Sequence, residues 1–467
     1  MRAEPQAAEY RPDPQILALA AWLGDAVAPA EFPRNDLRFR NRRWDQAVGL
    51  GDLSDEAWVG HMARFEPLPD NLPQPLALRY HGHQFRSYNP EIGDGRGFTF
   101  AQLRDGDGRL LDLGTKGSGL TPYSRTADGR LTLKGAVREI LATEMLEALG
   151  VNTSKTFSVV ETGEALVRGD EPSPTRSAVL VRLSHSHIRI GTFQRLAALE
   201  EDAHMAALVD YCLAQFPGPL PPTDAPDADH PAVILMHQAT ERLADLAASY
   251  MVAGFVHGVL NTDNINLTGE SFDYGPWRWL PTWDASFTAA YFDHSGLYSF
   301  GRQPEAIRWN LAQLGVALSR IAEGPALVAA FERFPTLYHA AMSRRFTWRL
   351  GVESRGVAAD FKLIEAAEQA MRESGKGPDA FFFDHRAGRA TTGPLADALS
   401  DYAPVPDAHP YWSSGAPQAM LIDEVEMIWS SIAEHDDWDP LAAKIDAVRA
   451  LGDALGEPPG PAGHAPA

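Results

Sequence analysis

The fold is decided by His257-Gly-Val-Leu-Asn-Thr-Asp-Asn264, with Asp273-Tyr-Gly275 beginning nine residues after Asn264. Protein kinases carry the pattern H-R-D-x-x-x-x-N followed by D-F-G, in which the Asn and the second Asp hold metal ions. In this chain the His, the Asn and the metal-binding Asp fall on His257, Asn264 and Asp273. Each piece alone is also ordinary turn chemistry, so the rest of the chain must decide between the two interpretations.

The catalytic Asp of the kinase pattern is missing from this stretch. Its position is taken by Val259, which cannot accept a proton. A carboxylate reappears at Asp263, beside Asn264. The sequence therefore indicates a kinase-like site whose usual base has been replaced rather than lost.

The composition is that of an acidic globular protein from a reducing compartment. The 467 residues predict a large two-lobed body or two to three domains. The formal charge of −21 argues against binding to nucleic acid or to an anionic membrane. The lone Cys212 excludes an internal disulfide and a multi-cysteine zinc site, and we find no secretory signal and no membrane-length apolar run. We expect a cytoplasmic protein with no nucleic-acid and no membrane partner.

A glycine-rich segment, Gly93-Asp-Gly-Arg-Gly97, precedes a strand-like run at 98–103. It is not the dinucleotide fingerprint, because the third Gly comes one residue early and a strand follows instead of a helix. A glycine-rich turn leading into a strand is the kinase arrangement, in which the backbone approaches phosphates closely. Arg96 adds a cation, and a plain hairpin turn is the alternative.

A second strand at 109–115 ends at Lys116, in the place of the kinase lysine that pairs with phosphate. A helix predicted at 135–149 places Glu139 23 residues after Lys116, where kinases carry the Glu that pairs with this Lys. Glu144 is the competing candidate on the same helix. Solvated surface positions are the alternative for all three side chains.

Between Pro172 and Leu199 the chain has no acidic residue but four arginines, at 176, 182, 189 and 195. In a chain of charge −21 this local excess of cations indicates a bound anion, and Arg gives bidentate geometry to phosphate. Arg182 and Arg189 flank a Ser-His-Ser-His bend that would bring them together. Two surface arginines are the alternative.

The remaining pattern is mostly helical. Apolar periodicity predicts helices at 14–28, 56–65, 232–255, 303–322, 325–346, 356–373, 416–434 and 439–455, and strands at 156–161 and 177–183. His81 and His83 form an H-x-H pair with no third ligand nearby, so we interpret them as packed or hydrogen-bonded side chains.

These segments predict an α+β, protein-kinase-like fold with a small mixed N-lobe sheet, a helix and a large helical C-lobe. The expected divisions are an N-terminal extension at 1–75, a nucleotide-binding N-lobe part at 76–215, a Pro-rich loop at 216–231, a helical C-lobe at 232–455 with the catalytic loop 257–275, and a disordered tail at 456–467.

With these motifs in order, the chain resembles the SelO (selenoprotein O, YdiU) family of kinase-like protein adenylyltransferases. The resemblance covers roughly residues 76–320 and rests on seven segments: Tyr80–Phe85, Asn89–Arg96, Leu113–Arg125, Asp128-Gly129, Arg138-Glu139, Arg182 with Ser186–Gly191, and His257–Asn264 with Asp273–Pro276.

The resemblance implies an enzyme that binds ATP in inverted orientation and transfers AMP to Ser, Thr or Tyr hydroxyls of proteins, with pyrophosphate leaving. It implies ATP contacts from Gly93, Gly95, Arg96, Lys116, Asp128, Gly129, Arg182, Arg189 and Asp273. Glu139 would position Lys116, and Asp263 would be the proton acceptor. Asn264 and Asp273 would hold Mg²⁺, or Mn²⁺.

Three alternatives stay open at this point. A small-molecule or protein phosphotransferase would use a similar loop, although Val259 argues against it. A non-catalytic nucleotide-binding pseudokinase fits the loss of the usual Asp, although Lys116, Glu139, Asn264 and Asp273 are all retained. UMP transfer from UTP with Mn²⁺ is the third. The family's redox control through a disulfide cannot operate within a chain whose sole cysteine is Cys212.

Overall fold

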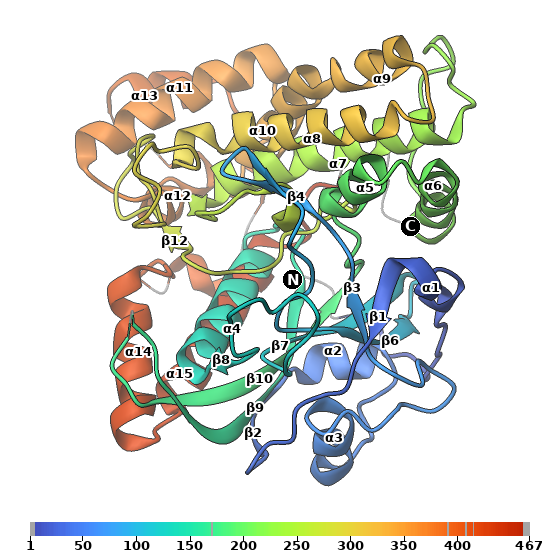
Figure 1. Ribbon diagram of the computed structural model, residues 1–467. Coiled ribbons are helices and arrows are strands. Elements are labelled where there is room, and N and C mark those ends of the chain that lie inside the picture. The colour runs from blue at the N-terminus through green and yellow to red at the C-terminus, as the bar shows by residue number, and fades with distance from the viewer. Residues whose placement is uncertain (1–4, 170, 390–391, 407–408, 414, 461–467) are drawn as a thin grey trace.

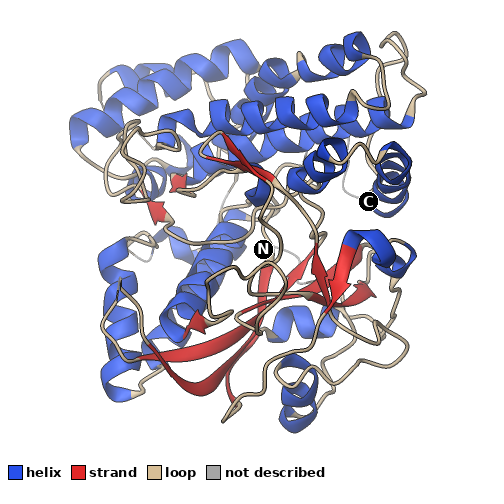
Figure 2. Cartoon of the chain, viewed as in Figure 1, coloured by secondary structure: helices blue, strands red, loops and turns tan. Residues whose placement is uncertain are grey.

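The computed structural model describes residues 5–169, 171–389, 392–406, 409–413 and 415–460. Within them the chain forms two lobes, one built on an antiparallel sheet and one built of helices (Figure 1, Figure 2). The α+β, two-lobed architecture expected of a protein-kinase-like fold is confirmed. Of the tail expected at 456–467, residues 461–467 lie outside the described part.

The sheet lobe contains eight strands, and neighbours along the sheet pair antiparallel. Strands β1 and β2 come from the first 75 residues and form the two edges of the sheet. The order is β1 (Gly24–Ala26), β3 (Leu76–Leu78), β6 (Thr99–Arg104), β7 (Leu110–Lys116), β10 (Thr175–Ser184), β9 (Lys155–Leu166) and β2 (Asp36–Arg40), and β8 (Leu131–Thr132) pairs with β10.

Alternation along β7 and β10 turns two cations to the same face of the sheet. Leu113 and Val181 pack into an apolar cluster on one face. Successive side chains of a strand point to opposite faces, so Lys116 and Arg182 point to the other face. The continuous register, in which Lys116 pairs with Leu180 and Gly114 with Arg182, keeps the two cations near each other.

Helix α4 (Leu133–Ala148) packs across the sheet against β9 and β10. It begins where the Thr132 hydroxyl accepts the Gly135 N–H at 3.1 Å, a typical N-cap. The C-terminal helices α14 (Ile422–His435) and α15 (Asp439–Leu455) return from the helical lobe and pack on α4 (Figure 1). An Arg449–Glu144 ion pair at 2.7 Å joins α15 to α4.

The helical lobe is organised around the long helix α7 (Pro231–Ala253), which contacts α6, α8, α9 and α10. The lobe consists of α5 (Ile190–Ala198), α6 (Asp202–Gln215), α8 (Gln303–Leu318), α9 (Gly324–Phe331), α10 (Phe334–Leu350), α11 (Val357–Ser374), α12 (Pro378–Asp384) and α13 (Pro394–Leu399). Helix α7 ends at Gly254, whose φ of 68° is left-handed. The chain then enters β11 (Phe255–Val256), which pairs with β12 (Arg278–Trp279) and so fixes both ends of the loop between them.

The smaller elements are divided between the sheet lobe and the helical lobe, and the β4–β5 hairpin contacts α5 of the helical lobe. They are α1 (Ala20–Leu23), α2 (Arg42–Ala47), α3 (Asp55–Met62), the hairpin β4 (Gly82–Gln84) and β5 (Ser87–Asn89), and five 3₁₀ turns at 15–18, 262–264, 300–302, 386–388 and 410–413. No helix in the described part of the chain is both long and apolar enough to cross a bilayer.

Three of the expected helices need correction. The helix at 14–28 is wrong, because Gly24–Ala26 pairs as a strand with Leu76–Leu78 and leaves only a 3₁₀ turn and the four-residue α1 before it. The helix at 325–346 is two helices, α9 and α10, and Pro335 lies in the first turn of α10, where its missing N–H costs nothing. The helix at 416–434 begins only at Ile422. Helices α5 and α6 were not expected.

Candidate active site

A cavity of about 370 Å³ lies between the sheet and the loop that joins β11 to β12. It brings together segments that are far apart in the sequence: the glycine-rich segment, the end of β7, the middle of β10, and Asp263 and Asp273 of the catalytic loop. Its principal lining residues are Tyr80, Gly93–Phe98, Lys116, Tyr123–Arg125, Arg182, His187, Arg189, Asp263 and Asp273.

Lys116 is buried at one end of this cavity and bridges two carboxylates. Its Nζ lies 2.7 Å from Glu139 Oε2 and 3.1 Å from Asp273 Oδ1. Glu139 therefore takes the partner position expected of it, whereas Glu144 is held by Arg449. The strand lysine, the helix glutamate and the aspartate of the D-x-G loop form the arrangement that protein kinases use to hold nucleotide phosphates.

Two arginines lie beside Lys116, and both are almost fully buried. Arg182 Nη2 is 3.7 Å from Asp273 Oδ1, and Arg189 Nη2 is 3.0 Å from Asp94 Oδ1. Both guanidinium groups lie against the Phe272 ring, at 5.4 and 4.9 Å from its centroid. The acid-free window of the sequence thus contributes two of its four arginines to the cavity.

Both guanidinium groups have nitrogens that can still donate hydrogen bonds. In the described part of the chain, Nε and Nη1 of Arg182 and Nε of Arg189 are buried without a partner. A buried cationic donor without an acceptor is costly. The part of the cavity lined by Arg182 and Arg189 therefore has the donors and the charge to receive an anion.

Asp263 and Asp273, the two catalytic-loop carboxylates that line the cavity, have opposite electrostatic environments. Burial raises the pKa of Asp263 to about 6, and the nearby charge of Asp273 acts in the same direction. Burial would also raise the pKa of Asp273, but the charges of Lys116, Arg182 and Arg189 outweigh it and hold this pKa well below its usual range. Carboxylates separated in this way suit different tasks, Asp263 the proton and Asp273 a cation.

Asp263 lies in the 3₁₀ turn Thr262–Asn264, and its Oδ1 is buried without a hydrogen-bond partner within the described residues. Its backbone carbonyl accepts Arg189 Nη1 at 3.1 Å. The same Arg189 nitrogen donates to the Tyr80 hydroxyl at 3.0 Å. This bonding holds the turn in place, and Oδ1 of the carboxylate keeps its capacity to accept a hydrogen bond at the cavity.

Asn264 does not line the cavity. Its amide donates to the Val259 carbonyl at 3.1 Å, which leaves its Oδ1 as the atom suited to a cation. Asp273, in left-handed backbone with a φ of 63°, is the other oxygen ligand that the catalytic loop offers. One or two protein oxygens with substrate phosphates make an ordinary Mg²⁺ site, so these residues fit the metal.

The glycine-rich segment lines the cavity through Gly93, Gly95, Arg96 and Gly97. A Cβ at Gly97 would lie 2.1 Å from the Thr115 carbonyl, and one at Gly93 would lie 2.4 Å from the Tyr123 ring. Packing within the protein therefore already requires glycine at these two positions.

The remaining expected contacts lie outside the cavity lining. Asp128 makes an ion pair with Arg168 at 2.8 Å, and a Cβ at Gly129 would lie 2.3 Å from the Gly119 carbonyl oxygen. Ala127, immediately before them, does line the cavity. His81 and His83 hydrogen-bond to Tyr88 and Gln194, as expected of a packed pair.

Sequence reasoning missed three residues that position the arginines: Tyr80, Asp94 and Phe272. Tyr80 and Asp94 bond to Arg189, and Phe272 lies under both guanidinium groups. Asp94 lies inside the glycine-rich segment and Phe272 directly precedes Asp273, so both were near recognised motifs. Only the fold shows what they touch.

The two-lobed fold and the lysine–glutamate–aspartate arrangement place the protein in the class built on a kinase-like scaffold. Comparison with known families gives a match to the family described as "Protein adenylyltransferase SelO" over residues 7–393. The chain therefore belongs to the SelO family and is a nucleotidyltransferase.

Curated relatives agree over nearly the whole chain. A "Protein nucleotidyltransferase YdiU" of Synechocystis sp. is 41% identical over 461 residues, which cover 92% of this chain and 95% of the relative. One of Synechococcus elongatus is 40% identical and covers 95% of this chain and 96% of the relative. Among solved structures, ROP2 from Toxoplasma gondii, described as having a protein-kinase fold and no enzymatic activity, aligns with a TM-score of 0.28 at 10% identity over 69% of this chain and 90% of that one. So remote a likeness carries no weight here.

Proposed function

We propose that the protein transfers AMP from ATP to a hydroxyl side chain of an acceptor protein, with ATP bound in inverted orientation and pyrophosphate leaving. The observation that supports this proposal best is the buried cluster of Lys116, Arg182 and Arg189, with guanidinium nitrogens that have no partner in the described chain.

The cluster suits phosphate and does not suit an adenine ring. An adenine pocket is mainly apolar with a few polar contacts, and burying a neutral ring against three cations would leave their charge uncompensated. The β- and γ-phosphates carry charges that these groups match, and Arg provides bidentate geometry to phosphate. With the phosphate tail at this end, the α-phosphorus and the nucleoside lie toward the opening. The glycine-rich segment, with Gly93, Gly95 and Arg96, and the turn at Asp128 and Gly129 would contact the nucleotide there.

The transfer step balances with the groups that the cavity provides. The acceptor oxygen forms a bond to the α-phosphorus as the bond to the bridging oxygen breaks, and pyrophosphate departs with that electron pair. The hydroxyl proton passes to the carboxylate of Asp263, whose pKa, raised to about 6 by burial, makes it a better base than a surface Asp yet leaves it ionised at pH 7. Lys116, Arg182 and Arg189 stabilise the charge on the leaving pyrophosphate.

Asn264 and Asp273 would hold Mg²⁺, with Glu139 keeping Lys116 in place. The metal, when bound, neutralises charge on the phosphate oxygens. Mn²⁺ prefers similar ligands, so the assay compares Mg²⁺ with Mn²⁺ and ATP with UTP.

The test is incubation of the whole chain with acceptor proteins and ATP labelled at either the α- or the γ-phosphate, with Mg²⁺ or Mn²⁺. We expect protein-bound label from the α-phosphate only. Label from the γ-phosphate only would instead establish a phosphotransferase. Nucleotide binding without any transfer would establish a pseudokinase, and label from UTP in place of ATP would establish a uridylyltransferase.

A further inference from the structure

A second cavity of about 480 Å³ adjoins the first on the side where α4 begins. Its walls are β8, the first turns of α4, the segment after Asp273 and the loop at 289–292. It shares Arg96 and Lys116 with the 370 Å³ cavity of the candidate active site, which we call the nucleotide cavity. We call the second cavity the basic groove; a ligand in it lies directly beside the nucleotide site.

The basic groove is strongly cationic for a chain of charge −21. Its described lining contains only two carboxylates, Glu171 and Glu426, against seven basic residues: Arg96, Lys116, Arg130, Lys134, Arg138, Arg168 and Arg278. Four of these are neutralised locally, by ion pairs of Lys116 with Glu139, Arg130 with Glu164, Lys134 with Glu426 and Arg168 with Asp128.

Three cations remain without a close carboxylate. Within the described residues, the Arg96 side chain has no hydrogen bond or ion pair. Arg138 reaches Glu426 only at 4.0 Å, and Arg278 donates only to the carbonyls of Pro276 and Trp277. These three guanidinium groups are where the groove can accept an anion.

Arg138 and Arg278 are held as a like-charged pair. Both donate to the Trp277 carbonyl, at 3.2 and 2.8 Å, and Arg138 also lies 4.6 Å over the Trp277 ring. Burial, together with repulsion from Arg278, lowers the pKa of Arg138 to about 10. Carbonyl dipoles offset only part of such repulsion, and a carboxylate placed between the two groups would stabilise both.

The groove also has an aromatic rim. Tyr291 and Phe292 are 81% and 42% exposed, and their ring centroids lie 5.1 Å apart. Exposed aromatic residues beside arginines are the composition of protein interfaces. The nucleoside of ATP carries no charge, so it would not explain the cations, and the overall negative charge opposes nucleic acid.

We propose that the basic groove binds an acidic segment of the acceptor protein, so that hydroxyl groups flanked by Asp or Glu are the preferred targets. This inference rests on the proposed function, because it places the acceptor beside the α-phosphorus. The binding of the segment itself is independent of transfer and can be measured alone.

The first experiment measures binding to the full chain of two fluorescent peptides, each with a central Ser flanked either by Glu or by Gln. We expect the Glu peptide to bind about tenfold more tightly, with a preference that weakens as salt is raised. The double variant Arg138→Gln with Arg278→Gln should lose the preference, whereas Arg372→Gln on α11 should keep it. Equal binding of the two peptides would overturn the proposal.

The second experiment measures transfer from α-labelled ATP to the same peptides. We expect the Gln double variant to lower kcat/KM for the Glu peptide about tenfold with an unchanged KM for ATP, and Arg278→Lys, which keeps the charge, to retain the preference. A raised KM for ATP with unchanged peptide preference would place the nucleotide in the groove and overturn the proposal. Selective peptide binding with no transfer by the unsubstituted chain would support the groove and remove the proposed function instead.

Discussion

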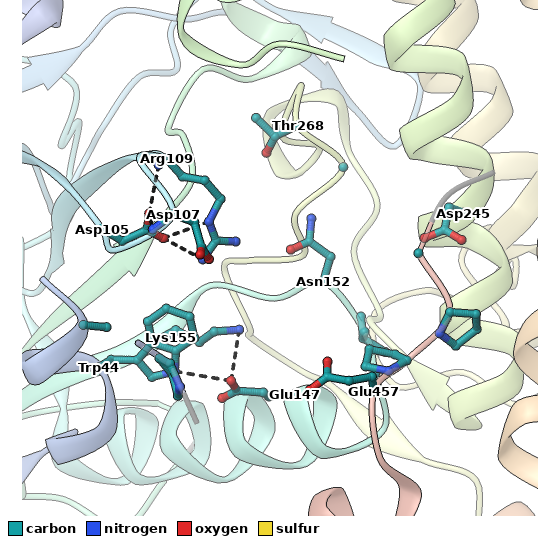
Figure 3. Close-up of a pocket in the computed structure, with 18 of the residues that line it drawn as sticks. Trp44, Asp105, Asp107, Arg109, Glu147, Asn152, Lys155, Asp245, Thr268 and Glu457 are labelled. Carbon is teal, nitrogen blue, oxygen red and sulfur yellow. Dashed lines mark hydrogen bonds and ion pairs between the residues drawn. The ribbon is translucent and has the colours of Figure 1, made fainter. Parts of the chain in front are cut away.

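The nucleotide cavity differs from a third cavity, which is lined by other residues, in the balance of its charges. The third one, which we call the balanced cavity, is larger, at about 600 Å³, and is lined by residues of both lobes (Figure 3). Its described lining contains five basic residues and five carboxylates: Arg43, Arg109, Lys155, Arg242 and Arg345 against Asp105, Asp107, Glu147, Asp245 and Glu457.

Several charged residues of the balanced cavity form ion pairs with one another. Arg109 meets Asp105 at 2.7 Å and Lys155 meets Glu147 at 3.7 Å (Figure 3). Arg345 donates to Asp245 at 2.9 Å.

In the nucleotide cavity five Lys and Arg residues face three aspartates in the described lining, whereas the two signs are equal in number in the balanced cavity. Both described linings include guanidinium nitrogens that are buried without a hydrogen-bond partner, on Arg182 and Arg189 in the nucleotide cavity and on Arg242 in the balanced one. The nucleotide cavity is the smaller of the two, and its described lining has the larger excess of cations. This excess, rather than size or the number of charged residues, makes it the better candidate for binding an anion.

The largest expected effect comes from removing the acid that gathers the cations. Asp273→Ala should lower transfer from α-labelled ATP by at least about a thousandfold, because the metal and Lys116 both lose their partner. The matched change in the balanced cavity, Asp107→Ala, should leave transfer within about twofold. Comparable losses in both variants would remove the distinction between the cavities.

The second largest effect is expected from Lys116→Ala, which should lower kcat/KM about a hundredfold. The variant loses a phosphate contact and leaves Glu139 without its partner. Steady-state kinetics with labelled ATP measures the loss in kcat/KM. Arg109→Ala, a cation of the balanced cavity, is the control and should be near neutral. Unchanged kinetics for Lys116→Ala would exclude this residue from the site.

The pH dependence tests Asp263. Because burial raises its pKa to about 6, transfer should fall as pH drops below about 6, where the carboxylate is protonated and cannot accept the hydroxyl proton. Asp263→Asn should lose about a hundredfold in rate at pH 7.5 and should no longer show this fall. A pH profile that is the same in both proteins would assign the proton to another group.

The buried carboxylate of Asp263 should also lower the free energy of unfolding when it is ionised. A folded pKa above the unfolded one means that Asp263 is most favourable to the fold below about pH 4 and that this contribution is lost as pH rises through about 6. Asp263→Asn should therefore be more stable than the unsubstituted chain at pH 8, by roughly 1–3 kcal/mol in denaturant unfolding. Equal stability at pH 8 would mean that the carboxylate is not strained by burial.

The smallest expected effect is on ligand-induced stability. Pyrophosphate should raise Tm by a few degrees by binding only the folded state, and Arg182→Gln should abolish most of this shift. Arg109→Gln should leave it intact. A shift that responds to Arg109 rather than Arg182 would move the anion site to the balanced cavity.

Local sequence signals predicted many of the side chains that the fold gathers at the nucleotide cavity. The catalytic loop, Lys116 and Glu139 could be found because their roles depend on short motifs and on strand and helix periods, which are properties of neighbouring residues. The cation excess at 172–199 pointed to an anion, but it could not separate Arg182 and Arg189 from Arg176, which pairs with Glu161 at 2.7 Å, and Arg195, which approaches Glu201.

What the sequence could not predict depends on long-range contacts. The edge strands β1 and β2 pair with segments about 50 and 120 residues away, and such pairing overrides the helical period at 14–28. The return of α14 and α15 onto α4, the Tyr80 and Asp94 contacts of Arg189, and the gathering of Arg138 and Arg278 likewise join residues with no local signal between them.

The orientation of the nucleotide tests the central claim most directly. A crystal structure of the chain with a non-hydrolysable ATP analogue and Mg²⁺ measures it. We predict the γ-phosphate against Arg182 and Arg189, with the adenine toward the opening. Adenine packed on Phe272 between these arginines, with the γ-phosphate directed out past Asp273, would contradict the account.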